Sequence, residues 1–567
     1  MIVLGVNSVY HESSAAVVRD GVVLAAAEEE RFNRRKHAKP CLVDNADDLP
    51  GDAIRFCIRQ AGITSADIDA VAYSFDPLLR RQLFRTDRLS LPGSWGSEDG
   101  ENAFLAALDR IPDRLSAALG VDLTGRIRWV PHHVAHAASA YYPAGVDSAD
   151  VLVVDGIGES ASTVLFAGAG PRLTRLEELR YPDSIGFVWE KLSVFLGFSE
   201  YDACKVMGLA SYGDPATFAA AFAKFLSVDG LLFHADPDIL RFRLPDVQPL
   251  EALLGPARRG GPIESRHADI AAALQDATNR AMLGLAAHLY DLHPSGNLCL
   301  AGGVALNCTA NSWIKDRSHF VNTYIPPAPH DAGTAVGAAL HVAHTEQASA
   351  RAGPMTTYLG PGYADEEILA AVEAAGLTAR RSPDVAAEAA RLLAGGSVVG
   401  WFQGQLELGP RALGNRSLLA DPRDPGMRET LNRKVKHRED FRPFAPSVLA
   451  EQASAWFDLG RPSPAYASML FTCPARPEKA HRIPAVLHVD GTARLQSVDA
   501  ADNPRYHRLI CAFADLTGVP MVLNTSFNDS EPIVCSPVDA LRTFRSTRID
   551  AVALGDYLVE RPDDLQR

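Results

Sequence analysis

The sequence lacks any pair of cysteines in a CxxC spacing, although it contains eight cysteines among its 567 residues. They are scattered along the chain at positions 41, 57, 204, 299, 308, 473, 511 and 535. In a long chain without an export signal, such cysteines are expected to be reduced and mostly buried.

Export and membrane signals are also missing. The first residues, MIVLGVNSVYHESS, have no basic lead and no sustained apolar core, so we expect no signal peptide. No apolar run is long enough to span a bilayer, and we expect no membrane partner. These absences predict a cytoplasmic protein of enzyme size.

An excess of positive charge is absent too. The chain has 55 Lys and Arg against 69 Asp and Glu, which gives a net charge of −14. This balance argues against a broad surface for nucleic acid or anionic membrane, but a local basic pocket is compatible with it. The composition, 47% hydrophobic and 22% charged, is that of an ordinary globular protein. The length predicts two or three domains.

Two similar strand–turn–strand patterns predict a duplicated α/β domain. The first has apolar runs at 2–6, 14–18 and 22–28, separated by a polar turn and by the hairpin signal Asp20-Gly21. The second has a strand at 151–154, a glycine-rich turn that begins at Asp155, and a strand near 162–166. We expect the two turns to face one cleft.

Two later turns open into helices. Gly302 and Gly303 follow an apolar strand, and Asp331 stands just before a small-residue helix that begins at Thr334. Unpaired backbone N–H groups point outward at helix starts, so both turns are candidate anion or nucleotide sites.

A segment rich in Ala, Gly, Pro and polar residues, 345–368, is typical of a linker. We place the domain boundary near residue 355, giving domains 1–355 and 356–567. The second domain begins with an amphipathic helix at 365–376 and a strand at 397–404.

The second domain contains a basic stretch between residues 411 and 442. A run of charge is usually a solvated face, but here the cations alternate with Gly, Pro and Phe in an acidic protein. We favour a pocket for a compact anion such as phosphate. The segment LNTSFN (523–528) offers hydroxyl and amide donors to the same anion.

The segment HHVAHAASAYY concentrates three histidines in five residues. His132 and His136 are four residues apart, so both rings lie on one face of a helix, as metal ligands require. Two structural histidines are an equally good interpretation of the pair alone. Asp155 and Asp331 are the carboxylates most suited to complete a site, and this donor set suits Fe²⁺, Mn²⁺ or Zn²⁺ better than Ca²⁺. We expect His133, on another helical face, to be structural.

His11 lies in the first polar turn. A turn histidine is usually a surface residue. Beside a nucleotide cleft, however, an imidazole can act as a general base near neutral pH.

The chain resembles the O-carbamoyltransferases of nodulation-factor biosynthesis and of antibiotic pathways such as tobramycin biosynthesis. The resemblance covers nearly the whole chain, with the motifs in the family's order. They are HESSAAVV, EEERFNRRKH, HHVAHAASAYY, VVDGIGES, KVMGLASYG, LAGGVALNC, HDAGTAVGAA, GPRALGNRSLLADPR, KHREDFRPFAPSV and LNTSFN.

This resemblance implies an N-terminal domain of the actin/sugar-kinase/Hsp70 class, similar to the universal tRNA threonylcarbamoyl transferase. It implies an α/β C-terminal domain similar to threonylcarbamoyl-adenylate synthase. In such enzymes the C-terminal domain converts carbamoyl phosphate and ATP to carbamoyladenylate. The N-terminal domain then transfers the carbamoyl group to a substrate hydroxyl and releases AMP.

The resemblance also implies residue roles. His11 would be the base that takes the proton of the substrate hydroxyl. The metal ligands would be His132, His136, Asp155 and Asp331, with Fe²⁺ suggested by the family and Mg²⁺ an option with ATP. The carbamoyl phosphate site would comprise Lys436, Arg442, Arg494, Thr525, Ser526 and Asn528. The nucleotide cleft would be lined by Lys205, Gly302, Gly303, Asn307 and Asn311, with Glu159 at the ribose.

Three other functions are weighed against an ATP-dependent O-carbamoyltransferase acting on a small natural product. A tRNA-modifying threonylcarbamoyl enzyme would need a surface for RNA, which the net charge disfavours. If the protein were a sugar kinase or an ATPase, its second domain would have no role. A non-enzymatic nucleotide-sensing module would make His11 and Lys436 dispensable. The sequence leaves the acceptor and the oligomeric state open, with a homodimer as one option and 74–100 as the candidate specificity loop.

Overall fold

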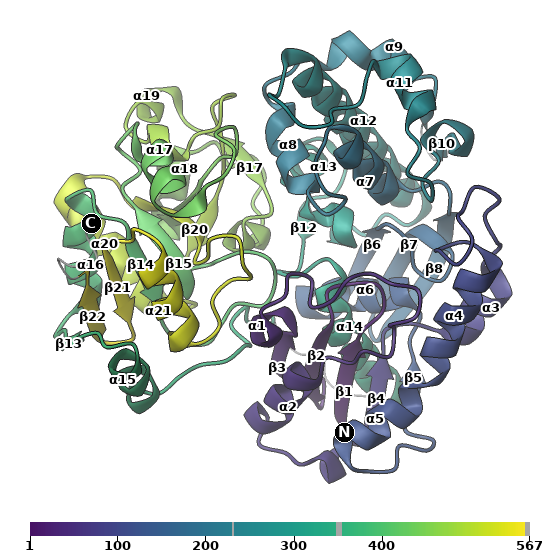
Figure 1. Cartoon of the computed structure of the whole chain (residues 1–567), viewed down its shortest axis with the longest axis horizontal. Helices are drawn as coiled ribbons and strands as arrows, with labels where there is room; N and C mark the ends of the chain where they lie inside the picture. The colour runs from purple at the N-terminus through teal and green to yellow at the C-terminus, as the bar shows by residue number, and fades with distance from the viewer. Residues whose placement is uncertain (230–231, 348–353, 562–567) are drawn as a thin grey trace. The chain divides into compact units, whose positions relative to one another are not determined.

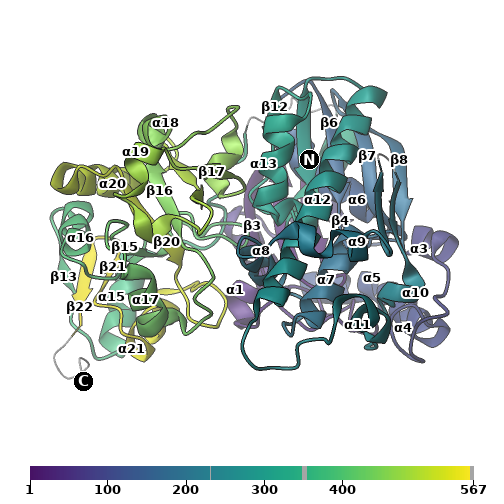
Figure 2. The same cartoon turned by 90° about the horizontal axis from the view of Figure 1, so that it is seen from above.

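The computed structural model describes residues 1–229, 232–347 and 354–561, which form two compact units (Figures 1 and 2). The first unit comprises Met1–Glu29 and His37–Met355, and the second comprises Glu30–Lys36 and Thr356–Arg567. The sequence suggests one change of unit near residue 355, whereas the structure adds an early exchange at Glu30–Lys36. Part of the expected linker, 348–353, lies outside the described residues. Within the described ranges, no helix has the length and apolar character needed to cross a membrane.

A five-stranded sheet forms the first half of the first unit. Its strands are ordered β3-β2-β1-β4-β5, with bounds β1 Ile2–Asn7, β2 Ser14–Arg19, β3 Val22–Glu28, β4 Ala70–Tyr73 and β5 Ile127–Trp129. The first three strands are antiparallel, and β4 and β5 add in parallel. Asp20 and Gly21 both have positive φ, of 51° and 84°. They form the two-residue turn that joins β2 to β3.

The second half of the first unit repeats this arrangement. Its sheet has the order β8-β7-β6-β11-β12, with bounds β6 Ser148–Val154, β7 Ala161–Ala169, β8 Arg172–Arg180, β11 Asn297–Ala301 and β12 Asn322–Tyr324. Again three antiparallel strands are followed by two parallel ones. The repeat confirms the predicted duplicated α/β domain.

Two helices pack between these sheets, as Figure 1 shows for α6 and α14. Helix α6 (His132–Tyr141) packs on β6 and β11, and α14 (Thr334–Glu346) packs on β1 and β2 and against α6. Helix α14 approaches both β1 and α6 closely because a glycine replaces a larger residue at each contact. A Cβ atom at Gly5 would lie 1.9 Å from the carbonyl oxygen of Ala335, and one at Gly337 would lie 1.8 Å from that of Ala135.

The second unit is built on one mixed sheet of eight strands, ordered β13-β22-β21-β14-β15-β20-β16-β19. Their bounds are β13 Arg380–Arg381, β14 Val399–Phe402, β15 Arg416–Ala420, β16 Ala445–Leu449, β19 Gln496–Val498, β20 Met521–Ser526, β21 Ala551–Leu554 and β22 Tyr557–Glu560. Helices α16 (Val385–Ala394) and α20 (Pro504–Thr517) lie on one face, and α15 (Asp365–Ala374) and α21 (Pro537–Ser546) on the other (Figure 2). This architecture confirms the predicted α/β class.

The segment Glu30–Lys36 belongs to the second unit because its side chains bind there. Arg34 donates hydrogen bonds to the carbonyl oxygens of Pro532 and Ile533 at 2.6 and 2.7 Å. Phe32 packs against a hydrophobic cluster of the second unit that includes Ile533. We call this segment the arm.

We expect Arg34→Ala to destabilise the second unit by about 2 kcal/mol, because two carbonyl groups lose charged donors. The neighbouring Arg35 is exposed and provides the matched control Arg35→Ala. Denaturant unfolding, followed by hydrogen exchange of second-unit peptides, measures the difference. Equal stability of the two variants would show that the arm does not contribute to the second unit.

Candidate functional site

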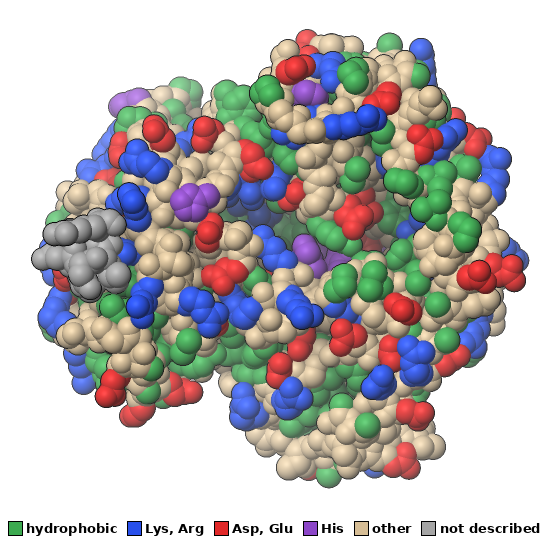
Figure 3. Space-filling view, viewed as in Figure 1, with side chains coloured by type: hydrophobic (Ala, Val, Ile, Leu, Met, Phe, Trp, Pro, Cys, Tyr) green, Lys and Arg blue, Asp and Glu red, His purple; other side chains and the backbone are tan. Residues whose placement is uncertain are grey.

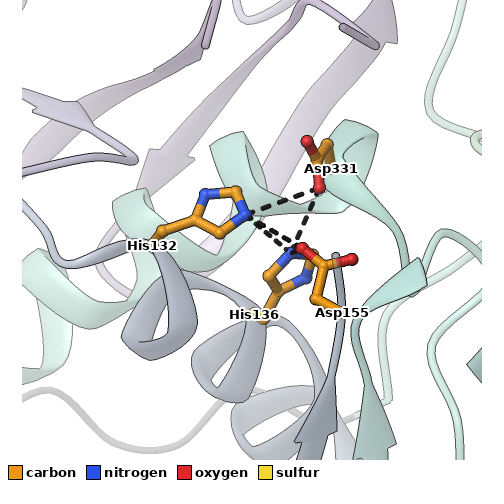
Figure 4. A group of neighbouring side chains, drawn as sticks. All are labelled: His132, His136, Asp155 and Asp331. Atoms are coloured by element: carbon orange, nitrogen blue, oxygen red, sulfur yellow. Dashed lines mark hydrogen bonds and ion pairs between the residues drawn. The ribbon is translucent and has the colours of Figure 1, made fainter. Parts of the chain in front are cut away.

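Four buried side chains of the first unit converge on one point, as Figure 4 shows for His132, His136, Asp155 and Asp331. The two histidines occupy the first turns of α6. Asp155 directly follows strand β6, and Asp331 lies in the short 3₁₀ turn before α14. Helix α6, the end of β6 and the turn before α14 therefore bring these four side chains together. We call this group the four-donor site.

The distances at the four-donor site fit a metal ion. His132 Nε2 lies 3.3 Å from Asp155 Oδ2 and 3.5 Å from Asp331 Oδ1. His136 Nε2 lies 3.5 and 3.3 Å from the same two atoms, and the two Nε2 atoms are 3.2 Å apart. Four atoms with this spacing surround a point about 2 Å from each, a typical bond length from zinc to nitrogen and oxygen.

Outer hydrogen bonds orient the ligands. His132 Nδ1 lies 3.2 Å from the carbonyl oxygen of Ser74, and His136 Nδ1 lies 3.0 Å from that of Pro329. When Nδ1 donates its proton to a carbonyl, Nε2 is left with a free lone pair. The backbone N–H of Gly303 donates to Asp155 Oδ1 at 2.8 Å, which fixes that carboxylate. Both histidines are thus held in the tautomer that metal binding needs.

The electrostatics of the four-donor site favour a cation. Burial opposes the charged form of His132, but the carboxylates of Asp331 and Asp155 outweigh it and hold its pKa well above the usual value. Burial likewise opposes ionisation of Asp155, yet the two histidines keep its pKa well below the usual value. Two buried carboxylates thus need positive charge between them. A set of two nitrogen and two oxygen donors suits a divalent transition metal better than Ca²⁺.

His133 lies apart from these donors. Burial, followed by the neighbouring charge of His132, lowers the pKa of His133 to about 3, so its ring is neutral. A Cβ atom at Gly158 would lie 2.7 Å from His133 Nδ1, so this ring fills the space beside the glycine turn.

A half-buried acid near the four-donor site was not singled out from the sequence. Glu190 lies in α7 (Ile185–Phe195). Burial raises its pKa to about 8, and the charges of Glu200, Asp155 and Asp331 act in the same direction. Near neutral pH this carboxyl group keeps its proton and can donate a hydrogen bond. A lone glutamate in an apolar helix gives no sequence signal of this kind.

His11 lies in the turn between β1 and β2, where its Nδ1 is 3.9 Å from Glu12 Oε1. Glu12 Oε1 also binds His37 Nδ1 at 2.5 Å. The sequence interpretation identified His11 but missed these two partners. Glu12 and His37 are 25 residues apart along the chain, so no local spacing signals their contact.

The residues predicted to line the nucleotide cleft have varied surroundings. Gly302 has φ +89° at the end of β11, where a Cβ atom would lie 2.2 Å from the carbonyl oxygen of Val154. Gly303 contacts Asp155 through its backbone N–H. Lys205, in α8 (Ala203–Ala210), forms an ion pair with Asp202 at 3.1 Å.

Three of these residues support the backbone in this structure. Asn307 accepts a hydrogen bond from the N–H of Ala310 at the start of α13 (Cys308–Arg317). Asn311 is fully buried and donates to the carbonyl oxygen of Ala305 at 2.8 Å. Glu159 Oε1 accepts the N–H of His132 at 2.8 Å, at the start of α6. The predicted contact of Glu159 with ribose stays a prediction.

A second site forms around Lys436 in the second unit. Lys436 is 7% exposed. It donates to the carbonyl oxygens of Ser526 and Asn528 at 2.6 and 2.8 Å, and to Asn528 Oδ1 at 2.7 Å. Burial lowers the pKa of Lys436 well below its usual value, and Arg438 and Arg442 lower it further. Among the described residues, Lys436 has no ion pair with a carboxylate.

The other predicted anion ligands occupy nearby elements of the same unit. Thr525 precedes Ser526 in β20, and Arg494 ends the short strand β18 (Thr492–Arg494). Arg442 is 3.8 Å from Glu439. The charge of Lys36, in the arm, also acts on Lys436. We call Lys436, Arg442, Ser526 and Asn528 the lysine site.

Much of the basic stretch serves other purposes, which corrects its interpretation as a single anion pocket. Arg416 is fully buried and donates to carbonyl oxygens, including those of Gln403 and Pro361 at 2.6 and 2.9 Å. Lys434 pairs with Asp550 at 2.8 Å. The sequence shows the density of cations but not which ones have local partners.

The surface charge is mixed on the face shown in Figure 3, where Lys and Arg lie among Asp and Glu over both units. This face presents no continuous basic area of the kind that a nucleic acid needs. The predicted specificity loop, 74–100, contains a fully buried cation. Arg80 pairs with Glu101 at 2.7 Å and donates to the carbonyl oxygen of Glu159 at 2.8 Å.

Comparisons with known proteins cover both units. A family model described as the carbamoyltransferase N-terminus matches residues 2–340, and one described as the carbamoyltransferase C-terminus matches residues 390–561. An uncharacterized protein of Synechocystis sp. is 36% identical over 630 residues, which covers 100% of this chain and 97% of that protein.

Two further relatives have more informative names. The nodulation protein NolNO of Sinorhizobium fredii is 38% identical over 577 residues, 99% of this chain and 81% of that protein. The 3′-hydroxymethylcephem-O-carbamoyltransferase of Amycolatopsis lactamdurans is 33% identical over 373 residues, 64% of this chain and 65% of that protein.

We expect His136→Ala to reduce bound divalent metal from about one ion per chain to well below it, because one of four ligands is lost. Elemental analysis of the purified full-length protein measures the metal. His133→Gln is the control, since His133 is next to His132 in the sequence but is not one of the residues whose ligand atoms converge. Retention of metal by His136→Ala, or its loss only on His133→Gln, would contradict this ligand assignment.

Proposed function

Because this chain belongs to the carbamoyltransferase family, we propose that it is an ATP-dependent O-carbamoyltransferase whose acceptor is a hydroxyl group of a small natural product. The lysine site carries this proposal. A buried ammonium beside further cations, held by carbonyl and amide oxygens and with no ion pair among the described residues, is suited to bind a small anion. Carbamoyl phosphate is an anion of this kind. The name of one relative, a cephem O-carbamoyltransferase, supports a hydroxyl acceptor.

The first step is proposed for the second unit. Carbamoyl phosphate, ATP and one water give carbamoyladenylate, with phosphate and pyrophosphate as the other products. Lys436, Arg442 and Arg494 hold the donor's phosphate, and the side chains of Thr525, Ser526 and Asn528 donate hydrogen bonds to it. The mixed anhydride reacts readily with water, so its enclosure by protein would protect it.

The second step is proposed for the first unit. The acceptor hydroxyl attacks the carbamoyl carbon, the carbon–oxygen bond to the phosphate breaks, and AMP leaves with the electron pair. His11 takes the hydroxyl proton. Lys205 and the loop at Gly302 and Gly303 hold the nucleotide. Glu190, which keeps its proton near neutral pH, can donate a hydrogen bond in the same region.

A divalent metal fits the four-donor site, and we propose Fe²⁺, with Mn²⁺ and Zn²⁺ as alternatives. When bound, it supplies a Lewis acid for phosphate oxygens of the nucleotide. The chain's own contribution is the rigid placement of the four donors. Their orientation depends on the carbonyl groups of Ser74 and Pro329 and on the N–H of Gly303.

We expect Lys436→Ala to abolish the formation of carbamoyladenylate from ATP and carbamoyl phosphate, because the donor's phosphate loses its buried cation. Mass spectrometry of the reaction mixture detects the product. Arg433→Ala is the control, since Arg433 lies on the same turn and its side chain is 67% exposed. If the wild-type protein makes ADP and no carbamoyladenylate, a kinase or ATPase replaces the proposal.

His11→Asn is expected to spare carbamoyladenylate formation and to slow transfer by about 10²- to 10⁴-fold, the usual contribution of a general base. Transfer is measured as AMP release and carbamate formation with a panel of hydroxylated natural products that includes 3′-hydroxymethylcephem. A variant in which both steps fall equally would remove His11 from the role of acceptor base.

A further inference from the structure

A polar cluster of the first unit lies around His11, separate from the four-donor site. Glu12 Oε1 is 2.5 Å from His37 Nδ1 and 3.9 Å from His11 Nδ1. The ring of Tyr201 lies 5.0 Å from that of His11 and 4.8 Å from that of His37, between ring centres. One carboxylate thus stands between two imidazoles that share an aromatic neighbour.

The backbone holds this cluster in an unusual conformation. Tyr10 and Glu12, on either side of His11, both have φ +58°, and His37 has φ +62°. Left-handed conformations are unfavourable for residues other than glycine, and they persist where surrounding contacts enforce them. Here the N–H of Glu12 donates to the carbonyl oxygen of His37 at 3.1 Å. The two loops are therefore fixed to each other next to His11.

The chemistry of Glu12 suits an acceptor rather than a base. Burial opposes its ionisation, but the hydrogen bond from His37 and the charges of His330 and His11 outweigh it and lower its pKa to about 2. A carboxylate this acidic removes protons poorly at neutral pH. It can accept a hydrogen bond from an imidazole N–H. His11 Nδ1 is buried and makes no hydrogen bond within the described part of the chain.

We propose that Glu12, held by His37, positions His11 by accepting a hydrogen bond from its Nδ1–H. The proton on Nδ1 leaves the lone pair on Nε2, which takes the proton of the acceptor hydroxyl. The carboxylate then stabilises the imidazolium that forms. A small rotation of the His11 side chain closes the separation of 3.9 Å, and we place this hydrogen bond in the free enzyme. This inference rests on the proposed role of His11.

The same three side chains also have the composition of a metal site. His11, Glu12 and His37 each offer a ligand atom, and these atoms lie within 4.8 Å of one another. Two histidines and one carboxylate can bind a divalent ion. An ion at His11 would occupy a nitrogen that the base needs, so the two interpretations exclude each other. Metal content therefore forms part of the test.

The test uses full-length protein with histidine labelled at ¹³Cδ2, whose chemical shift reports the imidazole tautomer. The His11 signal is identified by its loss in His11→Asn. We expect the Nδ1–H tautomer in the wild-type protein. In Glu12→Gln the ratio of Nε2–H to Nδ1–H rises by about five-fold, the factor that one hydrogen bond is worth. An unchanged ratio would overturn the proposal.

Further variants separate positioning from general damage. His37→Asn keeps a donor near the position of Nδ1 and tolerates positive φ, so it preserves the wild-type tautomer, whereas His37→Ala does not. Glu177→Gln is the matched control, because Glu177 binds His288 at 3.0 Å on an exposed part of the same unit. It must leave the His11 signal unchanged.

Two independent measurements complete the design. Metal bound per chain stays the same in Glu12→Gln and His37→Ala, and a fall in either would identify the cluster as a metal site and overturn the positioning role. Carbamoyladenylate formation, assayed in the same preparations, reports the proposed function separately. Its absence would refute the carbamoyltransferase mechanism while the tautomer result still decides what Glu12 does.

Discussion

The first unit depends on the burial of two carboxylates, Asp155 and Asp331, beside two imidazoles. Charges taken out of water are costly unless partners compensate them. Here the compensation needs atoms within 3.5 Å of one another. That spacing depends in turn on where α6, α14 and the end of β6 meet. The duplicated sheets bring those ends together, and glycines at the helix contacts allow the approach.

The second unit has the opposite arrangement of charge, with buried positive groups in place of buried carboxylates. At the lysine site a buried ammonium lies among further cations and is held by backbone carbonyl groups and an amide. One unit therefore carries negative donors suited to a cation, and the other carries positive donors suited to an anion. A reaction that handles a nucleotide with a metal and a small phosphorylated donor needs both kinds of site. Each is built within its own unit.

Much of the fold follows from the sequence, because hairpin signals and apolar runs are local. Asp20-Gly21 indicates a turn whose residues have positive φ, and the repeated pattern at residues 151–166 indicates the duplication. Helical spacing likewise suggests that His132 and His136 share a face. Their convergence with Asp331 depends on the packing of α14 and cannot be obtained from spacing.

The other features of the site could not be predicted from the sequence, for physical reasons. Which cations of the basic stretch are free depends on partners elsewhere, as Arg416 shows with its buried carbonyl contacts. The pairing of Glu12 with His37 joins two loops with no shared period. Glu190 becomes notable only because burial raises its pKa. Such properties arise from three-dimensional surroundings rather than from sequence pattern.

The position of the arm in the sequence has a consequence for folding during synthesis. Arg34 is synthesised 498 residues before Pro532, whose carbonyl oxygen it binds. At about 5 to 20 residues per second, roughly 25 to 100 s pass before this partner exists. During that time Phe32 and Arg34 lack their binding surface, while the first unit, whose strands β3 and β4 flank the arm in the sequence, can already fold. The second unit therefore completes its fold with a peptide that was synthesised long before the rest of that unit.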